Sequence, residues 1–445
     1  MTAKPTRPQS TELNQRFVEW FRHSSPYVRT HRGKTFVISI TSVQLTSANF
    51  DNHLQDLALL SSLGIRLVIV HGTRTQIDNT TTDAAGAPFA HGVRITDAHA
   101  IEQAKAACGI ARADIEAGLS RGIINSPAAR TTIRIGSGNF ITAKPIGVQN
   151  GVDYQLTGSI RRIDKAGILS RLDAGDVVLI SPLGYSPTGE VFNLVADDLA
   201  LALAIELSAD KLVMFLDEVY SISPEKRNSV FSPAEADRLS EVLKHNPTDR
   251  RRLHNALIAS EHRIARVHLI PEPVDGSILL ELFTREGLGM LITSQSYETI
   301  RQADINDLPG ILSIIAPLEA EGTLIRRPRE RIELSIDDYY VIESESMIIA
   351  VAALHPLGAA HSAELACLAV HRDYRRSSHG ERLLKHVEAV ARNNGIDQLF
   401  VLTTTGSHWF TEHGFVEIAV HRLPQEKLNH YDEKRNSKAL IKSLC

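Results

Sequence analysis

Residues 364–384 combine a strand pattern with a loop suited to binding phosphate groups. They read ELACLAVHRDYRRSSHGERLL, so apolar residues up to Val370 are followed by small and basic residues and then by a helical pattern. A loop that opens a helix presents several backbone N–H groups at the positive end of the helix dipole, which suits a pyrophosphate. Arginines in such a loop add charge-assisted hydrogen bonds. The residues expected to hold the phosphates are Arg375, Arg376, Ser378 and Gly380.

The same stretch carries a motif of an enzyme family. From Val370 to Gly380 it reads V-x-x-x-Y followed by R-x-x-S-x-G. This resembles the main motif of the GNAT acetyltransferases, which is R/Q-x-x-G-x-G/A after V-x-P-x-Y. Ser378 replaces the first glycine and Arg372 the usual proline. The motif by itself is equally compatible with an ordinary helix N-terminus.

A later segment strengthens the resemblance. A strand pattern over residues 399–404 is followed by aromatic residues at 408–410 and by Gly414-Phe415, as in the later GNAT motif. In that fold the strands of the two motifs diverge, and the pantetheine arm of the coenzyme pairs with backbone groups in the gap like an added strand. The resemblance therefore implies acetyl-CoA as co-substrate, with Leu368 and Val370 in the gap and no metal.

Over nearly its whole length, from about Phe17 to Lys442, the chain resembles the bacterial N-acetylglutamate synthases. In that family an amino-acid-kinase-like domain precedes the GNAT domain, and the first step of arginine biosynthesis is catalysed. Segments that carry the resemblance include Phe21–Tyr27, His31–Phe36, Gly136–Phe140, Gly158–Asp164, Gly189–Asn193, Leu324–Arg327, Leu402–Phe410 and Arg435–Lys438.

The family resemblance assigns the acceptor site. Arg326, Arg435 and Ser437 match the positions that bind the α-carboxylate of glutamate. Arginine binds a carboxylate through two parallel hydrogen bonds, and a hydroxyl can fill a remaining lone pair. Without the family, the basic run that begins at Arg326 would be read as a solvated helix start. Pro328 stands where the family often has serine.

The resemblance also assigns the acyl-transfer chemistry. Glu364 matches the general base that removes a proton from the acceptor ammonium, directly or through a water molecule. The backbone N–H of Leu368 or a neighbour would stabilise the oxyanion. Thr403, which begins a run of three threonines, would protonate the departing thiolate. Cys367 is a weaker alternative as a nucleophile, because a cysteine in a strand is more often a small core residue.

The first domain resembles the amino-acid kinases but lacks their phosphate-binding residues. Ser39-Ile-Thr41-Ser42 stands where active members carry Lys-x-Gly-Gly, and no second phosphate-binding lysine is evident after Asp217. Phosphoryl transfer depends on such charges, so we expect no kinase activity.

The segment before residue 290 instead resembles the arginine-feedback site of related enzymes, although Met290 replaces the family's threonine. A plain helix–loop–strand connection is the alternative. The residues assigned to arginine are Tyr27, Phe283, Glu286, Gly287 and Gly289.

Two different folds must position these residues. Short apolar strands alternate with helical patterns in the first part of the chain, which predicts a mostly parallel sheet covered on both faces, an α/β three-layer sandwich. Antiparallel strands followed by a βαβ unit predict an α+β fold in the second part. We expect residues 1–293 to form the kinase-like domain, 294–297 the linker and 298–445 the GNAT domain. Phe17–Val28 is expected to be a short helix that ends near Pro26.

Composition sets limits on the class of protein. The 445 residues are 43% apolar and 22% charged with a net charge of −4, typical of a globular protein rather than a nucleic-acid binder. Cys108, Cys367 and Cys445 form no C-x-x-C pair, so neither a disulfide framework nor a zinc site is expected. The polar N-terminus and the lack of a long apolar run favour a reduced cytoplasmic protein. The family resemblance implies a homo-oligomer, often a hexamer.

Two other functions stay open at this stage. A GNAT enzyme could acetylate a different amino acid, such as aspartate. The chain could also be a catalytically inactive regulatory protein that binds arginine. Retention of the catalytic and phosphate-loop residues favours an active glutamate acetyltransferase.

Overall fold

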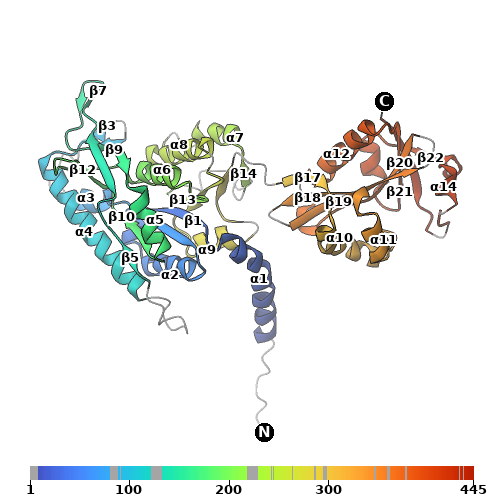
Figure 1. The fold of residues 1–445 in the computed structure, drawn as a ribbon, viewed down its shortest axis with the longest axis horizontal. Helices are drawn as coiled ribbons and strands as arrows, with labels where there is room; N and C mark the ends of the chain where they lie inside the picture. The colour runs from blue at the N-terminus through green and yellow to red at the C-terminus, as the bar shows by residue number, and fades with distance from the viewer. Residues whose placement is uncertain are drawn as a thin grey trace, which may run out of the picture. The chain divides into compact units, whose positions relative to one another are not determined.

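The computed structural model divides the chain into two compact units, Met1–Gln295 and Ser296–Cys445 (Figure 1). The predicted linker, 294–297, lies outside the described residues. The residues that the structure describes are 9–80, 89–90, 92–121, 133–217, 229–241, 243, 245–262, 264–284, 287–293, 298–344, 347–357, 361–375, 378–429, 431–433 and 435–444.

The first unit is built on an eight-stranded sheet in the order β14-β16-β15-β13-β1-β2-β10-β5. All neighbouring strands are parallel except β15 and β16. Short β-branched runs such as TFVISI form its fully buried central strands. The strands are β1 Thr35–Ile40, β2 Arg66–His71, β5 Ile135–Gly136, β10 Val177–Ile180, β13 Lys211–Leu216, β14 Ser229–Phe231, β15 Arg266–Pro271 and β16 Met290–Ile292.

Helices cover both faces of this sheet. Successive residues of β1 point to opposite faces: Val37 belongs to one apolar core, and Phe36 and Ile38 belong to the other. This confirms the three-layer α/β sandwich. On the Val37 side lie α5 Lys165–Asp173, α6 Ala196–Leu207 and α8 Pro247–Glu261. On the Phe36 side lie α2 Phe50–Ser62, α4 Ala98–Ser120 and α9 Ser277–Phe283.

Smaller elements complete the first unit. A four-stranded sheet has the order β12-β11-β6-β9, and two short hairpins pair β3 with β4 and β7 with β8. Their bounds are β3 Phe89–Ala90, β4 Val93–Arg94, β6 Ile141–Pro145, β7 Val148–Gln149, β8 Val152–Asp153, β9 Gly158–Ile163, β11 Leu183–Tyr185 and β12 Val191–Asn193. Two further helices are α3 Arg74–Thr80 and α7 Pro233–Asp237.

The N-terminal helix is longer than the sequence predicts. Helix α1 spans Gln9–His31 and continues through Pro26, so the predicted end near Pro26 is wrong. Proline removes one backbone hydrogen bond, but tertiary contacts hold the turn that follows it. The ring of His31 packs 5.4 Å from that of Phe36, and its Nε2 bonds the carbonyl of Leu282 at 2.8 Å.

The second unit is built on a seven-stranded sheet in the order β17-β18-β19-β20-β21-β23-β22. Only β20 and β21 are parallel neighbours, and an apolar core lies on each face. The strands are β17 Glu298–Gln302, β18 Tyr339–Ser344, β19 Met347–Leu357, β20 Ser362–Val370, β21 Gln398–Thr403, β22 Val416–Ile418 and β23 Lys438–Ser443. The helices are α10 Leu308–Ala320, α11 Arg329–Leu334, α12 His379–Asn393, α13 Ser407–Glu412 and α14 Gln425–Leu428.

Strands β20 and β21 separate soon after they begin. Their pairing covers only residues 362–364 of β20, although that strand continues to Val370. A β-bulge interrupts the register between β19 and β20, and Cys367 within it has a φ of 53°. A bulge bends its strand and frees ladder groups. The backbone beyond Glu364 is therefore not paired with β21.

None of the helices in the described part of the chain is long and apolar enough to cross a bilayer.

Candidate active site and effector site

The predicted base, Glu364, lies at the last pair before β20 and β21 separate. Its side chain is buried and forms an ion pair with Lys427 of α14, with 2.6 Å between Oε2 and Nζ. His355 of β19 is its direct cross-strand partner and bonds Asp338 through Nδ1 at 2.9 Å. Residues directly opposite in an antiparallel pair share one face of the sheet. Glu364 therefore lies between a cation and a histidine that sequence reasoning did not single out.

The predicted acceptor residues come from two separate segments that meet. Arg435 donates a hydrogen bond to the carbonyl of Thr323, at the start of the loop that carries Arg326. Its Nε is buried and has no hydrogen-bond partner among the described residues. Ser437 is buried, and its backbone carbonyl accepts a 2.7 Å bond from the Tyr431 hydroxyl. The side chain of Arg326 is exposed, so the structure brings its loop to Arg435 without a direct contact between the two guanidinium groups.

The unpartnered Nε of Arg435 indicates which kind of ligand fits between Arg435 and the loop that carries Arg326. A buried N–H without an acceptor carries a desolvation cost of about 1–3 kcal/mol, more when the group is charged. A carboxylate placed there would remove that cost, since it accepts two parallel hydrogen bonds from a guanidinium. The geometry of this corner therefore suits an anionic acceptor.

The predicted phosphate loop lies between the end of β20 and helix α12. Ser378 is the N-cap of α12, and its side chain makes no capping hydrogen bond. A Cβ at Gly380 would lie 3.7 Å from Val370 and 3.6 Å from Trp409 of α13, so the two GNAT-like motifs meet here. Unsatisfied N–H groups at a helix N-terminus suit an anion.

The other residues predicted to bind the coenzyme are Leu368, Val370, Arg375 and Arg376. Leu368 and Val370 are half-buried in the part of β20 that is not paired with β21. Arg375 is exposed, and its Nε lies 3.4 Å from the carbonyl of Val370, a group that would be needed to pair with a pantetheine arm. Arg376 lies outside the described residues.

Thr403 can act as a proton donor, whereas Cys367 is poorly suited to act as a nucleophile. Thr403, at the end of β21, accepts a 2.9 Å hydrogen bond from the Gly406 N–H, which leaves its hydroxyl proton able to donate. Burial raises the pKa of the Cys367 thiol. The thiolate is the nucleophilic form, so the structure disfavours Cys367 as a nucleophile.

The predicted effector residues surround a buried aromatic and polar cluster in the first unit. Phe283 is buried with its ring 5.6 Å from that of His31, and His31 in turn lies 6.3 Å from Tyr27. A Cβ on Gly289 would lie 2.3 Å from the carbonyl of Leu269, so only glycine fits there. Glu286, the predicted partner of the effector, lies outside the described residues.

Glu281 supplies the carboxylate of this cluster, and sequence reasoning missed it. Its Oε2 accepts hydrogen bonds from the N–H groups of Leu288 at 2.7 Å and Gly289 at 2.8 Å. A Cβ on Gly287 would lie 2.7 Å from the same oxygen. The signal that could have found Glu281 is a glutamate in the apolar sequence SILLELF of α9, because a buried carboxylate is always paired or hydrogen-bonded.

A chain of polar groups continues from Glu281 to a lysine. His268 bonds Glu281 through Nδ1 at 2.6 Å, and its Nε2 lies 3.2 Å from Nζ of Lys211. Burial, reinforced by the charge of Lys211, lowers the pKa of His268 to about 4. Burial alone would raise the pKa of Glu281, but the bond to His268 and the two backbone N–H groups lower it. A buried carboxylate and a buried ammonium thus lie at the two ends of a neutral imidazole.

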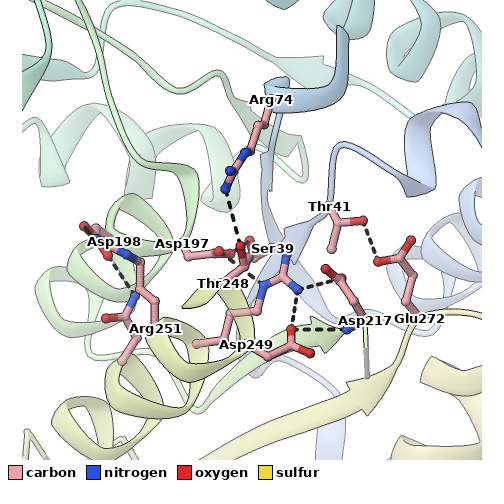
Figure 2. A network of polar contacts seen from close by, with 12 residues as sticks. Ser39, Thr41, Arg74, Asp197, Asp198, Asp217, Thr248, Asp249, Arg251 and Glu272 are labelled. Carbon is pink, nitrogen blue, oxygen red and sulfur yellow. Dashed lines mark hydrogen bonds and ion pairs between the residues drawn. The ribbon is translucent and has the colours of Figure 1, made fainter. Parts of the chain in front are cut away.

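A cavity of about 310 Å³ lies at the carboxyl ends of β1, β2 and β13, where a kinase-like domain would hold its substrates. Its polar groups bind one another (Figure 2). Ser39 donates to Asp197 and Thr41 to Glu272, each at 2.9 Å. The guanidinium of Arg252 lies within hydrogen-bond distance of Asp197, Asp217 and Asp249.

This arrangement differs from a phosphoryl-transfer site. No lysine lines the described wall of the cavity, and the guanidinium of Arg252 occupies the position between the carboxylates that a magnesium ion would take. Among the described residues there is also no group of histidine, cysteine or acidic side chains arranged to bind a metal.

The fold and these sites define an amino-acid-kinase-like domain followed by a GNAT domain. Family models agree: residues 34–261 match the amino acid kinase family, and residues 335–417 match the acetyltransferase (GNAT) domain. An amino-acid acetyltransferase of Pseudomonas putida (strain GB-1) is 44% identical over 96% of this chain and 99% of its own length. The chain belongs to the amino-acid acetyltransferase family.

Solved structures of one relative cover the same length. N-acetylglutamate synthase from Neisseria gonorrhoeae complexed with coenzyme A and L-arginine is 36% identical, with a TM-score of 0.85 over 96% of this chain and 99% of that one. The same enzyme complexed with coenzyme A and N-acetyl-glutamate matches with a TM-score of 0.60 over the same shares. The predicted order of domains and the predicted enzyme class are confirmed.

Proposed function

We propose that this protein transfers the acetyl group of acetyl-CoA to the α-amino group of L-glutamate, giving N-acetyl-L-glutamate and CoA. The observation that carries the proposal is the buried, unpartnered Nε of Arg435 beside the loop of Arg326, in the same unit as Glu364. It is supported by the relative from Neisseria gonorrhoeae, which binds coenzyme A in two structures and N-acetyl-glutamate in one of them.

The acceptor would bind through its α-carboxylate. Arg435, with the help of Arg326 and Ser437, would hold the two carboxylate oxygens. This fixes the amino group relative to the thioester and converts a bimolecular encounter into an oriented reaction. The acceptor's ammonium would replace Lys427 as the partner of Glu364, because both are cations that a carboxylate binds at about 2.6–3 Å.

Acyl transfer then follows from the positions of the groups. Glu364 takes a proton from the ammonium and passes it to solvent, and the free amine attacks the thioester carbonyl carbon. The attacking nitrogen, now positively charged, gives its second proton to Glu364. The backbone N–H of Leu368 stabilises the oxyanion that forms, and the C–S bond then breaks. Thr403 donates a proton to the sulfur and recovers one from solvent. Arg375, Arg376, Ser378 and Gly380 hold the pyrophosphate of the coenzyme, while Val370 pairs with its pantetheine arm.

The first unit would bind arginine as a feedback inhibitor of the first step in arginine biosynthesis. The buried Glu281 offers the guanidinium a carboxylate, and Tyr27 and Phe283 offer it aromatic rings. The predicted Glu286, with Gly287 and Gly289, completes the proposed site. The related Neisseria structure in complex with L-arginine supports this assignment.

The proposed assembly is a cytoplasmic homo-oligomer, with a hexamer as the candidate state. Helix α1 carries Phe17 and Phe21, whose stacked rings are 63% and 61% exposed. Exposed aromatic residues of this kind on one helix favour contact with another protein surface. A second copy of the same helix is the proposed partner.

The proposed reaction is tested by product identification. Full-length protein is incubated with acetyl-CoA and L-glutamate, and the products are analysed by mass spectrometry and by thiol titration. Equal amounts of N-acetyl-L-glutamate and free CoA are expected. Release of CoA without N-acetyl-L-glutamate would contradict the proposal.

A further inference from the structure

Glu298 connects the start of the second unit to the helix of the phosphate loop. It is the first residue of β17 and directly follows residues 294–297 in the sequence. Its Oε1 bonds Nε2 of His379, and its Oε2 bonds a terminal nitrogen of Arg382. Both carboxylate oxygens thus bind the first turn of α12. Two charge-assisted contacts from one side chain fix orientation as well as distance.

The first turn of α12 depends on these contacts, because its own cap is incomplete. Ser378 makes no side-chain capping bond, so no hydroxyl fixes the start of the helix. His379 is buried, and its Nδ1 lies 3.3 Å from the carbonyl of Tyr374. The imidazole therefore lies between the loop that precedes the helix and the carboxylate of Glu298. Movement of Glu298 would shift both the loop and the helix start.

The electrostatics of the cluster keep Glu298 ionised. Burial alone would raise the pKa of its carboxyl, but the hydrogen bonds and charges of His379 and Arg382 lower it. The carboxylate also draws the Arg382 side chain to β17. Arg382 thus supports the helix start from the β17 side instead of extending into solvent.

We propose that Glu298 is a positioning residue for the coenzyme: it holds the first turn of α12 in the orientation that binds the pyrophosphate of acetyl-CoA. The inference rests on the proposed function, since α12 must be the helix that receives the coenzyme. Glu298 itself touches no reacting atom.

A purely structural ion pair would have a different signature. Loss of such a pair lowers stability and the fraction of active enzyme, so the apparent kcat falls while both KM values stay unchanged. Loss of a positioning contact at the coenzyme loop weakens acetyl-CoA binding selectively. The KM for acetyl-CoA, compared with kcat and with the KM for glutamate, separates the two.

The matched control is another carboxylate of the same sheet. Glu343 of β18 binds Arg301 of β17 at 2.7 Å, while Arg301 keeps its second partner Asp307. Glu343→Gln therefore removes an ion pair of β17 that does not reach α12. Glu298→Gln and Glu343→Gln are compared with the unchanged full-length protein by steady-state kinetics and thermal melting.

We expect Glu298→Gln to raise the KM for acetyl-CoA about tenfold, the usual scale for losing charge-assisted contacts. The KM for glutamate, kcat and the kinetics of Glu343→Gln should stay within about twofold. Should Glu298→Gln not fold, Arg382→Gln removes one of the same contacts and should raise the same KM. An unchanged KM for acetyl-CoA in a folded variant would overturn the proposal. Lack of acetyl transfer by the unchanged protein would instead overturn the proposed function.

Discussion

Glu364 and Arg435 meet the two chemical requirements of the proposed reaction: Glu364 is the proton acceptor, and Arg435 supplies hydrogen-bond donors for the carboxylate of the acceptor. Glu364 forms an ion pair with Lys427 at 2.6 Å. Arg435 is held by the carbonyl of Thr323 but keeps a buried N–H unused. Both side chains are thus oriented by other groups of the protein, and preorganised groups of this kind are what catalysis requires.

Replacing Glu364 by glutamine removes the proposed base and keeps the shape of the side chain. Turnover at pH 7 should fall about 10²-fold or more, the usual scale for a positioned general base. The affinity for acetyl-CoA, measured by equilibrium binding, should change little. Unchanged turnover would remove Glu364 from the mechanism.

Removing the Arg435 guanidinium should act on the acceptor instead. Arg435→Ala is expected to raise the KM for glutamate about tenfold or more, because charge-assisted hydrogen bonds to the carboxylate are lost. The KM for acetyl-CoA should stay the same within about twofold. The assignment fails if the effect appears only in the KM for acetyl-CoA.

At the residue scale, the sequence predicted groups that belong to motifs and missed their partners. Glu364 and Arg435 could be assigned because they match family positions. Lys427 and Glu281 could not be assigned, because only the folded structure brings their partners close to them. Lys427 reaches Glu364 across 63 positions, and Glu281 bonds backbone N–H groups that exist only once the glycine loop has folded.

At the scale of elements, strand patterns were sufficient to predict the fold class of both units. Buried runs such as VVLI of β10 and KLVMFL of β13 are short and rich in β-branched and apolar residues, which favours strands over helices. Helix α1 could not be predicted fully. Its continuation past Pro26 depends on contacts of His31 with Phe36 and with the carbonyl of Leu282, both supplied by distant segments. The bulge at Cys367 likewise follows from pairing with β19 rather than from local sequence.

The contact between the residues that follow β1 and β15 should make the first unit sensitive to pH. Glu272, directly after β15, accepts a hydrogen bond from Thr41, directly after β1. Burial, together with a hydrogen bond to Asp217, raises the pKa of Glu272 to about 7. The folded state therefore binds this proton more tightly than the unfolded state, whose carboxyl titrates near 4.5. Stability from this group is present below about pH 4.5 and is lost as pH rises through 7.

Glu272→Gln removes the titration while retaining an acceptor for Thr41. The melting temperature of Glu272→Gln minus that of the unchanged protein should be larger at pH 8 than at pH 5. The control is Glu417→Gln, at an exposed ion pair with Lys438, whose relative melting temperature should be the same at both pH values. A difference that is larger at pH 5 than at pH 8 would contradict the predicted titration of Glu272.

At the scale of the whole molecule, the chain joins an amino-acid-kinase-like unit to a GNAT unit. In the first unit, Arg252 binds the acidic residues that a kinase would need for metal. Its retained feature is the polar chain from Lys211 through His268 to Glu281. Regulation of the second unit is the proposed use of that feature.

Arginine should lower the rate of acetyl transfer several-fold at saturation. Coupling between distinct sites is typically worth about 1–3 kcal/mol, which corresponds to about 5- to 150-fold. Glu281→Gln removes the carboxylate that would bind the guanidinium and should raise the arginine concentration needed for half-inhibition. The measurement is the initial rate against arginine concentration. If arginine neither binds nor changes the rate, the first unit has no sensing role.

The central claim is that glutamate is the acceptor, and the most direct test is CoA release from acetyl-CoA with a panel of amino acids. The panel is L-glutamate, L-aspartate, L-glutamine and L-ornithine, each at a range of concentrations with the full-length protein. The value of kcat/KM for glutamate should exceed the values for aspartate, glutamine and ornithine about tenfold or more. Equal or greater kcat/KM with aspartate, glutamine or ornithine would contradict the claim.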